Sequence, residues 1–237
     1  MTAFNLPHVP AIRAIGTALP DPTLDQPVAA THAAARATAD PKRRRVLHRL
    51  YQRSGVDHRR VVLDELTRPT DAPPDPALLA PPTHPADPGP TTAARLAHYH
   101  PHAERLLVAA AQNAIAAAQT DPAHVTHLVT ASCTGFHAPG VDLALIDRLG
   151  LPPTTQRTHV GFMGCHAALN ALRVARAFVL ADPNAVVLVG AVEVCSIHLA
   201  YGWQPDVLVG NALFADGAAA AIVSATDDAE PTPPTPP

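Results

Sequence analysis

One cysteine of the chain lies where a cysteine can act as a nucleophile. Cys165 follows the short apolar run at 160–163 and Gly164, and a helix-forming run begins at Cys165 itself. A thiol at a helix start lies near unpaired backbone N–H groups and the positive end of the helix dipole, and both favour the thiolate. Gly161 and Gly164 allow the sharp turn that this position needs. The pattern predicts an acyl-transfer nucleophile, and the alternative is a small buried residue at a helix start.

A predicted helix over residues 41–54 carries the densest positive charge of the chain. Arg45, Arg49 and Arg53 follow one another at intervals of four, which places them on one ridge of this helix. The planar guanidinium group of arginine matches phosphate oxygens with a fork of donors. We therefore expect this ridge to bind a phosphate-rich ligand, and a nucleic acid contact or a solvated helix face are the alternatives.

Three histidines at alternate positions, His98, His100 and His102, invite a metal interpretation. Alternate spacing brings side chains together on a strand, whereas a helix or a proline turn is expected here. We expect no carboxylate or cysteine ligand close in sequence to complete a ligand set. We therefore expect no metal site at these three histidines.

Composition narrows the class of protein. The chain has 237 residues, 47% of them apolar, and a net charge of -3, which gives no general reason to expect nucleic acid as a partner. Three widely spaced cysteines argue against a disulfide framework and suit a reducing cytoplasm. No stretch has the length and apolarity of a membrane span, and the first ten residues lack a signal-peptide pattern. We expect a cytoplasmic protein that neither spans nor coats a membrane.

The order of expected elements indicates an α/β domain with a mostly parallel sheet. Strands are predicted at 9–15, 59–63, 125–132, 158–163 and 185–192, with a last strand after a turn at Asp216–Gly217. Helices are predicted at 25–40, 41–54, 91–98, 102–119, 141–149 and 165–180. One domain is expected over 1–226, with a proline-rich loop at 68–90 and a disordered acidic and proline-rich tail at 227–237.

Three motifs together resemble a known family. They are Gly161-Phe162-Met163-Gly164-Cys165, the segment from Gly135 through Pro139-Gly140, and Leu213-Phe214-Ala215-Asp216-Gly217-Ala218-Ala219-Ala220. In this order and at these separations they resemble the type III polyketide synthases, the chalcone and stilbene synthase family, in its bacterial form. The resemblance covers about residues 10 to 226, the family's N-terminal region, and implies one half of the five-layer thiolase fold.

The resemblance implies a role for each matching position. Cys165 matches the nucleophile that takes an acyl group from a coenzyme A thioester and holds it while malonyl-CoA is decarboxylated and condensed onto it. Phe214 matches a gate between the coenzyme A tunnel and the acyl cavity. Arg49 and Arg53 match basic residues that hold coenzyme A phosphates, and Arg45 could cover a third basic position that is Val46 here. No permanently bound cofactor is implied, because coenzyme A thioesters are substrates.

Four further positions match the family less specifically. Cys133, Thr134 and His198 fall at cavity-lining positions, and Ala138 falls where the family reaches across its homodimer interface. Ordinary packing is the alternative at each of the four.

The family's catalytic histidine and asparagine belong to its C-terminal half, and no residue of this sequence is assigned to their roles. We therefore expect that the 237-residue chain alone does not complete polyketide synthesis. Two alternatives stay open at this point: a condensing enzyme like ketoacyl synthase III, and a non-catalytic remnant or dimerisation subunit that binds coenzyme A.

Overall fold

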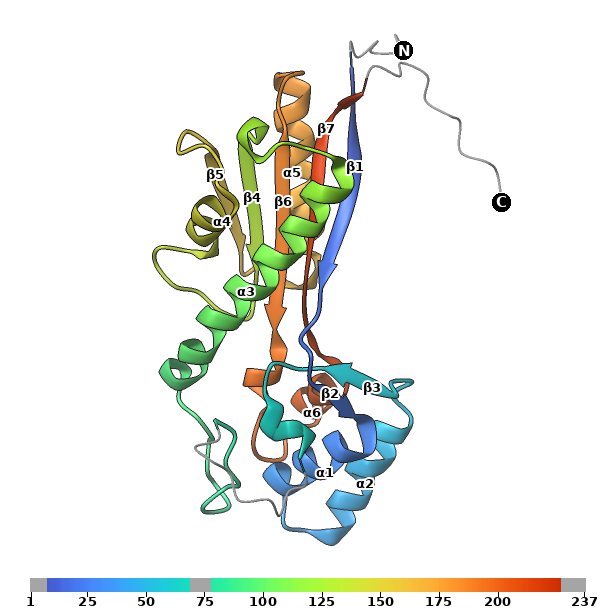
Figure 1. The fold of residues 1–237 in the computed structure, drawn as a ribbon. Coiled ribbons are helices and arrows are strands. Elements are labelled where there is room, and N and C mark those ends of the chain that lie inside the picture. Colours follow the sequence, from blue (N-terminus) through green and yellow to red (C-terminus); the bar gives the residue numbers. More distant parts are fainter. Residues whose placement is uncertain (1–7, 69–77, 227–237) are drawn as a thin grey trace, which may run out of the picture.

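A five-stranded sheet forms the centre of the molecule. The computed structural model describes residues 8–68 and 78–226, so the predicted tail at 227–237 lies outside the described residues. The strands lie in the order β1-β7-β6-β4-β5 (Figure 1). Their bounds are β1 Val9–Ala18, β4 His127–Ser132, β5 Gln156–Gly161, β6 Val187–Val194 and β7 Asp216–Thr226.

Four of these strands run in one direction. β4 pairs in parallel with both β5 and β6, whereas β7 is antiparallel to its neighbours β6 and β1. The mostly parallel sheet predicted from the sequence is therefore confirmed. The strands on either side of the Cys165 elbow, β5 and β6, are not neighbours, because β4 lies between them. The connection from β5 to β6 thus passes over β4.

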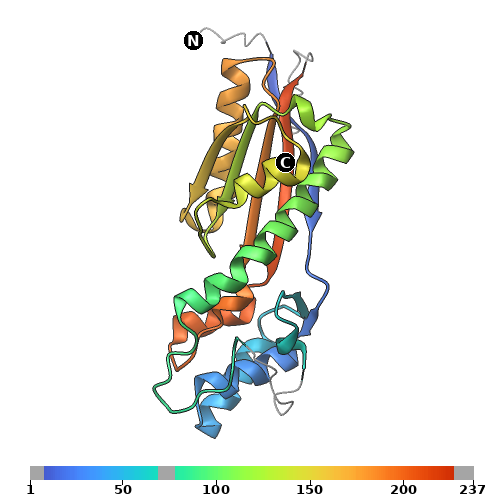
Figure 2. The same cartoon turned by 60° about the vertical axis from the view of Figure 1, so that its left-hand side comes forward.

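Helices cover both faces of the sheet. On one face, α3 (Thr92–Ala118) packs on β1, β7 and β6, and α4 (Val141–Leu149) packs beside α3. On the other face, α5 (Ala167–Ala181) packs on β4, β6 and β7 within a second hydrophobic core (Figures 1 and 2). Fully buried alanines line both helices, and small side chains let a helix approach a sheet closely. The arrangement is a three-layer α/β unit.

A smaller group of elements lies beyond the end of the sheet, at the bottom of Figure 1. It contains α1 (Gln26–Ala37), α2 (Pro41–Gln52), α6 (Pro205–Leu213) and a two-stranded sheet of β2 (Thr23–Asp25) and β3 (His58–Arg60). Short 3₁₀ turns lie at Asp64–Thr67, Pro122–His124, Gly164–His166 and Cys195–His198. Over residues 8–68 and 78–226, no helix combines the length and apolarity needed to cross a membrane.

Several local predictions were wrong. The helices expected at 91–98 and 102–119 are one helix, α3, which continues through Pro101. Pro101 and Ala97 are both exposed, so the carbonyl that loses its hydrogen bond to Pro101 lies on the solvent side. No helix was predicted after 165–180, yet Pro205–Leu213 form α6, which begins with Pro205 in its first turn.

Gly16 was expected to end the first strand, yet β1 continues through it to Ala18. A Cβ at Gly16 would lie 2.3 Å from both the Ala110 carbonyl oxygen and the Ala114 nitrogen of α3. The absent side chain therefore serves close packing of a helix on a strand rather than a turn.

Candidate active site

The backbone makes a sharp elbow just before Cys165. β5 ends at Gly161, Gly164–His166 form a 3₁₀ turn, and α5 begins at Ala167, two residues later than predicted. Gly164 adopts the left-handed backbone conformation, with a φ of 72°, as predicted for a glycine at this turn. The second residue in this conformation is Phe162, with a φ of 55°, and not Gly161. A bulky residue in this region is strained, and such strain clusters at functional sites. Cys165 is exposed at this elbow, as a nucleophile requires.

The elbow is held from the loop that follows β4. The Cys133 sulfur accepts a hydrogen bond from the Gly164 nitrogen at 3.1 Å. The Glu193 carboxylate of β6 accepts from the Cys133 nitrogen at 2.9 Å, the Thr134 nitrogen at 2.9 Å and the Thr134 hydroxyl at 2.6 Å. Glu193 therefore fixes Cys133, and Cys133 in turn fixes the backbone beside Cys165.

A turn after β6 brings His198 to the same place. His198 Nε2 lies 2.5 Å from the Thr134 carbonyl oxygen, to which it donates. The buried Asp216 carboxylate holds the start of this turn by accepting from the Ser196 nitrogen at 2.7 Å, and from the Val62 nitrogen at 2.7 Å. Burial raises the pKa of Asp216. His198 is thus anchored at the rim of the site through its Nε2.

One cavity of about 820 Å³ lies at the carboxyl ends of β4 and β6. Its walls include Cys133, Thr134, Cys165, Glu193, Cys195, His198 and Phe214, together with the apolar side chains of Leu24, Ala29, Val61, Leu66 and Leu199. A largely apolar cavity with a few polar groups suits a small organic ligand. Burial raises the pKa of Cys195 to about 12, so Cys195 stays a thiol at neutral pH.

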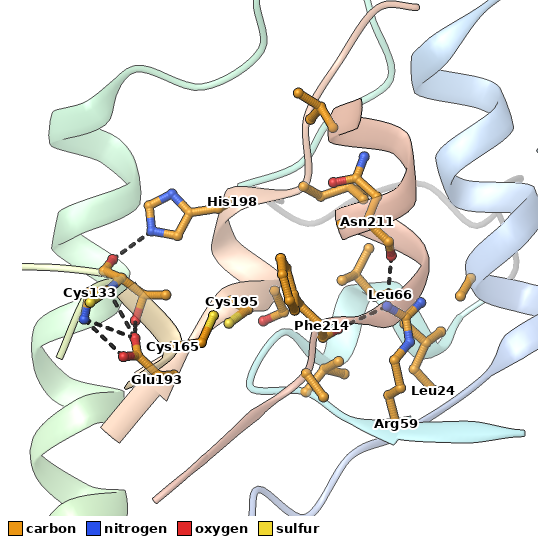
Figure 3. Close-up of a pocket in the computed structure, with 18 of the residues that line it drawn as sticks. Leu24, Arg59, Leu66, Cys133, Cys165, Glu193, Cys195, His198, Asn211 and Phe214 are labelled. Carbon is orange, nitrogen blue, oxygen red and sulfur yellow. Dashed lines mark hydrogen bonds between the residues drawn. The ribbon is translucent and has the colours of Figure 1, made fainter. Parts of the chain in front are cut away.

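Phe214 lies across the middle of the view in Figure 3, between Cys165, Cys195 and Glu193 on one side and Arg59 and Leu24 on the other. Its side chain is 54% exposed although it lines the cavity. Its backbone is fixed, because the Arg59 guanidinium donates to the carbonyl oxygens of Phe214 at 2.9 Å and Asn211 at 2.7 Å. The arrangement is a half-exposed ring on a backbone that Arg59 holds in place.

Other predicted site residues lie outside this cavity. Arg45, Arg49 and Arg53 are exposed on α2 and at its C-cap, and the Arg53 nitrogen donates to the Arg49 carbonyl at 3.1 Å, so the helical path reaches Arg53. Their common ridge is therefore present, but none of the three lines the cavity. Ala138 is exposed in the loop between β4 and α4 and does not line it either.

Sequence reasoning missed Glu193 and Arg59. Glu193 is a single carboxylate near the end of an otherwise apolar strand, at the edge where α/β sheets place their ligands, and this signal could have identified it. Arg59 was assigned only to a short strand, and nothing in the sequence indicated that it contacts Phe214, 155 residues later.

Comparison with known proteins identifies the family. The family model for the N-terminal domain of chalcone and stilbene synthases matches residues 8–227. The chain belongs to this family. Its central sheet and helices are accordingly those of the thiolase-like fold, and the type III polyketide synthase assignment suggested by the three motifs is confirmed.

Individual relatives agree with this assignment. The chain is 35% identical over 218 residues to the alpha-pyrone synthesis polyketide synthase-like Pks18 of Mycobacterium tuberculosis, which covers 92% of this chain and 52% of that protein. It is 42% identical over 131 residues to bisdemethoxycurcumin synthase of Oryza sativa, covering 53% of this chain and 32% of the synthase. The chain therefore spans about half the length of Pks18.

Solved structures show the same likeness. PKS-I of the brown alga Ectocarpus siliculosus superposes with a TM-score of 0.80 at 31% identity, over 92% of this chain and 57% of that one. The type III polyketide synthase domain of Steely1 from Dictyostelium superposes with a TM-score of 0.79 at 26% identity, over 91% of this chain and 56% of that one.

Proposed function

We propose that this chain carries the acyl-loading centre of a type III polyketide synthase. The Cys165 thiolate attacks the carbonyl of an acyl-CoA, a thioester to Cys165 forms, and coenzyme A leaves as its thiol. Malonyl-CoA then loses carbon dioxide, the resulting carbanion attacks the thioester carbonyl, and Cys165 is released. The observation that carries the proposal is the exposed Cys165 at a strained elbow in the wall of a largely apolar cavity of about 820 Å³.

The other residues of the site support this function in distinct ways. We assign Arg49 and Arg53, with Arg45, to the phosphates of coenzyme A, because guanidinium groups on one exposed helix ridge match a polyanion. The Phe214 ring, on its fixed backbone, gates the passage toward Cys165. Cys133, Thr134 and His198 shape the cavity wall beside the nucleophile.

We also propose that the protein works as a homodimer in the cytoplasm. The family match supports a dimer, and so does an exposed apolar surface beside Ala138. There the rings of Phe136 and Phe162, 57% and 67% exposed, stack edge to face at 5.8 Å between centroids. Such a surface favours contact with another polypeptide.

Loading and condensation are separable in this proposal. Condensation needs a histidine and an asparagine to stabilise the enolate and the oxyanion, and we assign neither role to any of the 237 residues. Loss of such stabilisation costs about 3 kcal/mol of barrier lowering for each donor. The 237-residue protein is therefore expected to become acylated at Cys165 without forming a polyketide.

The test is intact-mass spectrometry of the purified 237-residue protein after incubation with hexanoyl-CoA and, separately, with added malonyl-CoA. One acyl group should appear on the wild type, on Cys133→Ser and on Cys195→Ser, and should be lost in Cys165→Ala. Labelling of Cys165→Ala at the wild-type rate would reject the loading function. Release of a polyketide by this protein would reject the separation of loading from condensation.

A second arm tests the arginine ridge. Replacing Arg49 and Arg53 together by alanine should raise the acyl-CoA concentration for half-maximal loading roughly 10-fold or more, because two charge-assisted contacts are lost. Arg148→Ala removes an exposed arginine from α4 and is the matched control. Equal loading curves for the double variant and the control would remove the ridge from the proposal.

A further inference from the structure

Three potential metal ligands meet where α3 passes the loop between β4 and α4. His100 and Glu104 lie one turn apart on α3, and His137 belongs to the loop. His100 Nε2 is 2.9 Å from Glu104 Oε1, and the centroids of the His100 and His137 rings are 3.8 Å apart. One ligand atom from each of the three residues lies within 4.8 Å of the other two. Fold geometry thus assembles two imidazoles and a carboxylate.

An orphaned nitrogen points to a ligand at this place. His137 Nε2 is buried and has no hydrogen-bond partner within the described part of the chain. Buried polar atoms are almost always paired, and an imidazole nitrogen without a hydrogen carries a lone pair that binds metals. The neighbouring His100 and Glu104 side chains are 48% and 19% exposed, so an ion can enter from solvent.

We propose that His100, Glu104 and His137 bind a divalent transition-metal ion, with Zn²⁺ as the best match. Two histidines and one glutamate are an established donor set for this ion, with water at the fourth position. Zinc bonds of about 2.0–2.2 Å require ligand atoms roughly 3.4 Å apart, so modest side-chain rotation, chiefly of the exposed His100, closes the cluster. The metal takes the place of the proton between His100 and Glu104 and gives His137 Nε2 its missing partner.

The expected role is structural. None of the three residues lines the cavity that contains Cys165, so the ion does not meet the acyl group. It would instead fasten α3 to the loop that begins with Cys133 and Thr134, and both of those residues line the cavity. The inference stands independently of the acyl-loading proposal.

The alternate spacing of the three histidines led to the prediction that no metal site lies here. Of His98, His100 and His102, only His100 takes part, because neighbouring alternate positions diverge by roughly 200° around a helix. The expectation that no carboxylate ligand lies close in sequence was wrong, because Glu104 lies four residues after His100. His137 comes from a loop 37 residues further along the chain than His100.

Isothermal titration of the purified 237-residue protein with Zn²⁺ tests the site. All variants share a Cys133→Ser and Cys165→Ser background, which removes accessible thiols that also bind zinc. The background protein should bind one equivalent tightly, and His137→Ala and Glu104→Gln should each weaken that binding at least roughly 10-fold. His98→Ala, on the other side of the same helix, is the matched control and should bind as the background does.

A second readout separates ligation from a change in folding. Co²⁺ bound in place of Zn²⁺ should give d–d absorption bands that are lost in His137→Ala, while circular dichroism shows that this variant keeps its helix content. Unchanged Zn²⁺ affinity and unchanged Co²⁺ bands in His137→Ala or Glu104→Gln would overturn the proposal and leave His100 and Glu104 as an ordinary ion pair.

Discussion

The isosteric substitution Glu193→Gln tests whether one carboxylate organises the loop beside Cys165. In the native protein the Cys133 nitrogen, the Thr134 nitrogen and the Thr134 hydroxyl all donate to Glu193. A glutamine offers one oxygen only. If that oxygen takes the Oε2 position it keeps the Thr134 donors, but its NH₂ group then faces the Cys133 nitrogen, which lies 2.9 Å from Oε1.

The magnitude follows from these contacts. Hydrogen bonds to a charged group contribute about 1.5–3 kcal/mol each and neutral ones about 1 kcal/mol, so three weakened bonds cost about 2 kcal/mol. The donor-against-donor contact at Cys133 adds to that loss. We expect the free energy of unfolding, measured by urea denaturation, to fall by about 2–3 kcal/mol.

The substitution should also slow chemistry at Cys165. Displacement of Cys133 releases the Gly164 nitrogen that its sulfur now holds at 3.1 Å. The rate of hexanoyl transfer to Cys165, followed by intact mass, should therefore fall together with stability. Asp147→Asn removes one exposed carboxylate from α4 and is the control for loss of charge alone, with an expected change within about 0.5 kcal/mol.

A double-mutant cycle with Thr134→Val decides whether the contact itself matters. The valine removes the hydroxyl that donates to Glu193 at 2.6 Å, so the two substitutions should be non-additive by about 1 kcal/mol. Additive effects, or a Glu193→Gln protein as stable as Asp147→Asn, would refute the view that Glu193 organises this loop.

Two further predictions concern stability. Gly16→Ala should lower the free energy of unfolding by about 3 kcal/mol or more, because its Cβ would meet backbone atoms of α3 at 2.3 Å. Urea denaturation measures this loss, with Thr17→Ala at the exposed neighbouring position as the control. A loss no larger than that of Thr17→Ala would contradict the prediction. Burial lowers the pKa of His32, whose Nε2 lies 2.8 Å from the Arg68 carbonyl and whose Nδ1 lies 3.1 Å from Arg36 Nη1. The stability that neutral His32 contributes is present above its ordinary pKa of 6.5 and is lost as pH falls toward the lowered value. The difference in unfolding free energy between wild type and His32→Gln should therefore shrink from about pH 7.5 to pH 5. A pH-independent difference would contradict the assignment.

Local sequence patterns predicted the elements that depend on local physics. The strands at 125–132 and 185–192 were correct to within two residues at each end, because long β-branched apolar runs form buried strands almost regardless of context. The elbow was also predictable, since a glycine between a strand and a helix-forming run leaves few backbone paths. Its strained residue was not, because surrounding packing holds Phe162 in the left-handed region.

Errors arose where packing overruled local preference. Pro101 breaks helices in isolation, yet α3 continues through it, because Tyr99 before the proline and Ala103, Leu106 and Leu107 after it are all buried in the core. Gly16 is a turn residue by propensity, and only the approach of α3 shows why β1 needs it. α6 was missed because its short apolar pattern is equally compatible with a strand or loop.

The sequence by itself determined the family and the basic ridge on α2, and it predicted Cys165 as the nucleophile, because each depends on residue types at short, fixed separations. Tertiary structure alone decided which distant residues share a site: Glu193 with Cys133, Arg59 with Phe214, and His137 with His100. The physical reason is that the order of strands in the sheet differs from their order in the chain, with β4 lying between β5 and β6. Which distant residues meet is therefore set by strand order and helix packing and not by their separation in the sequence.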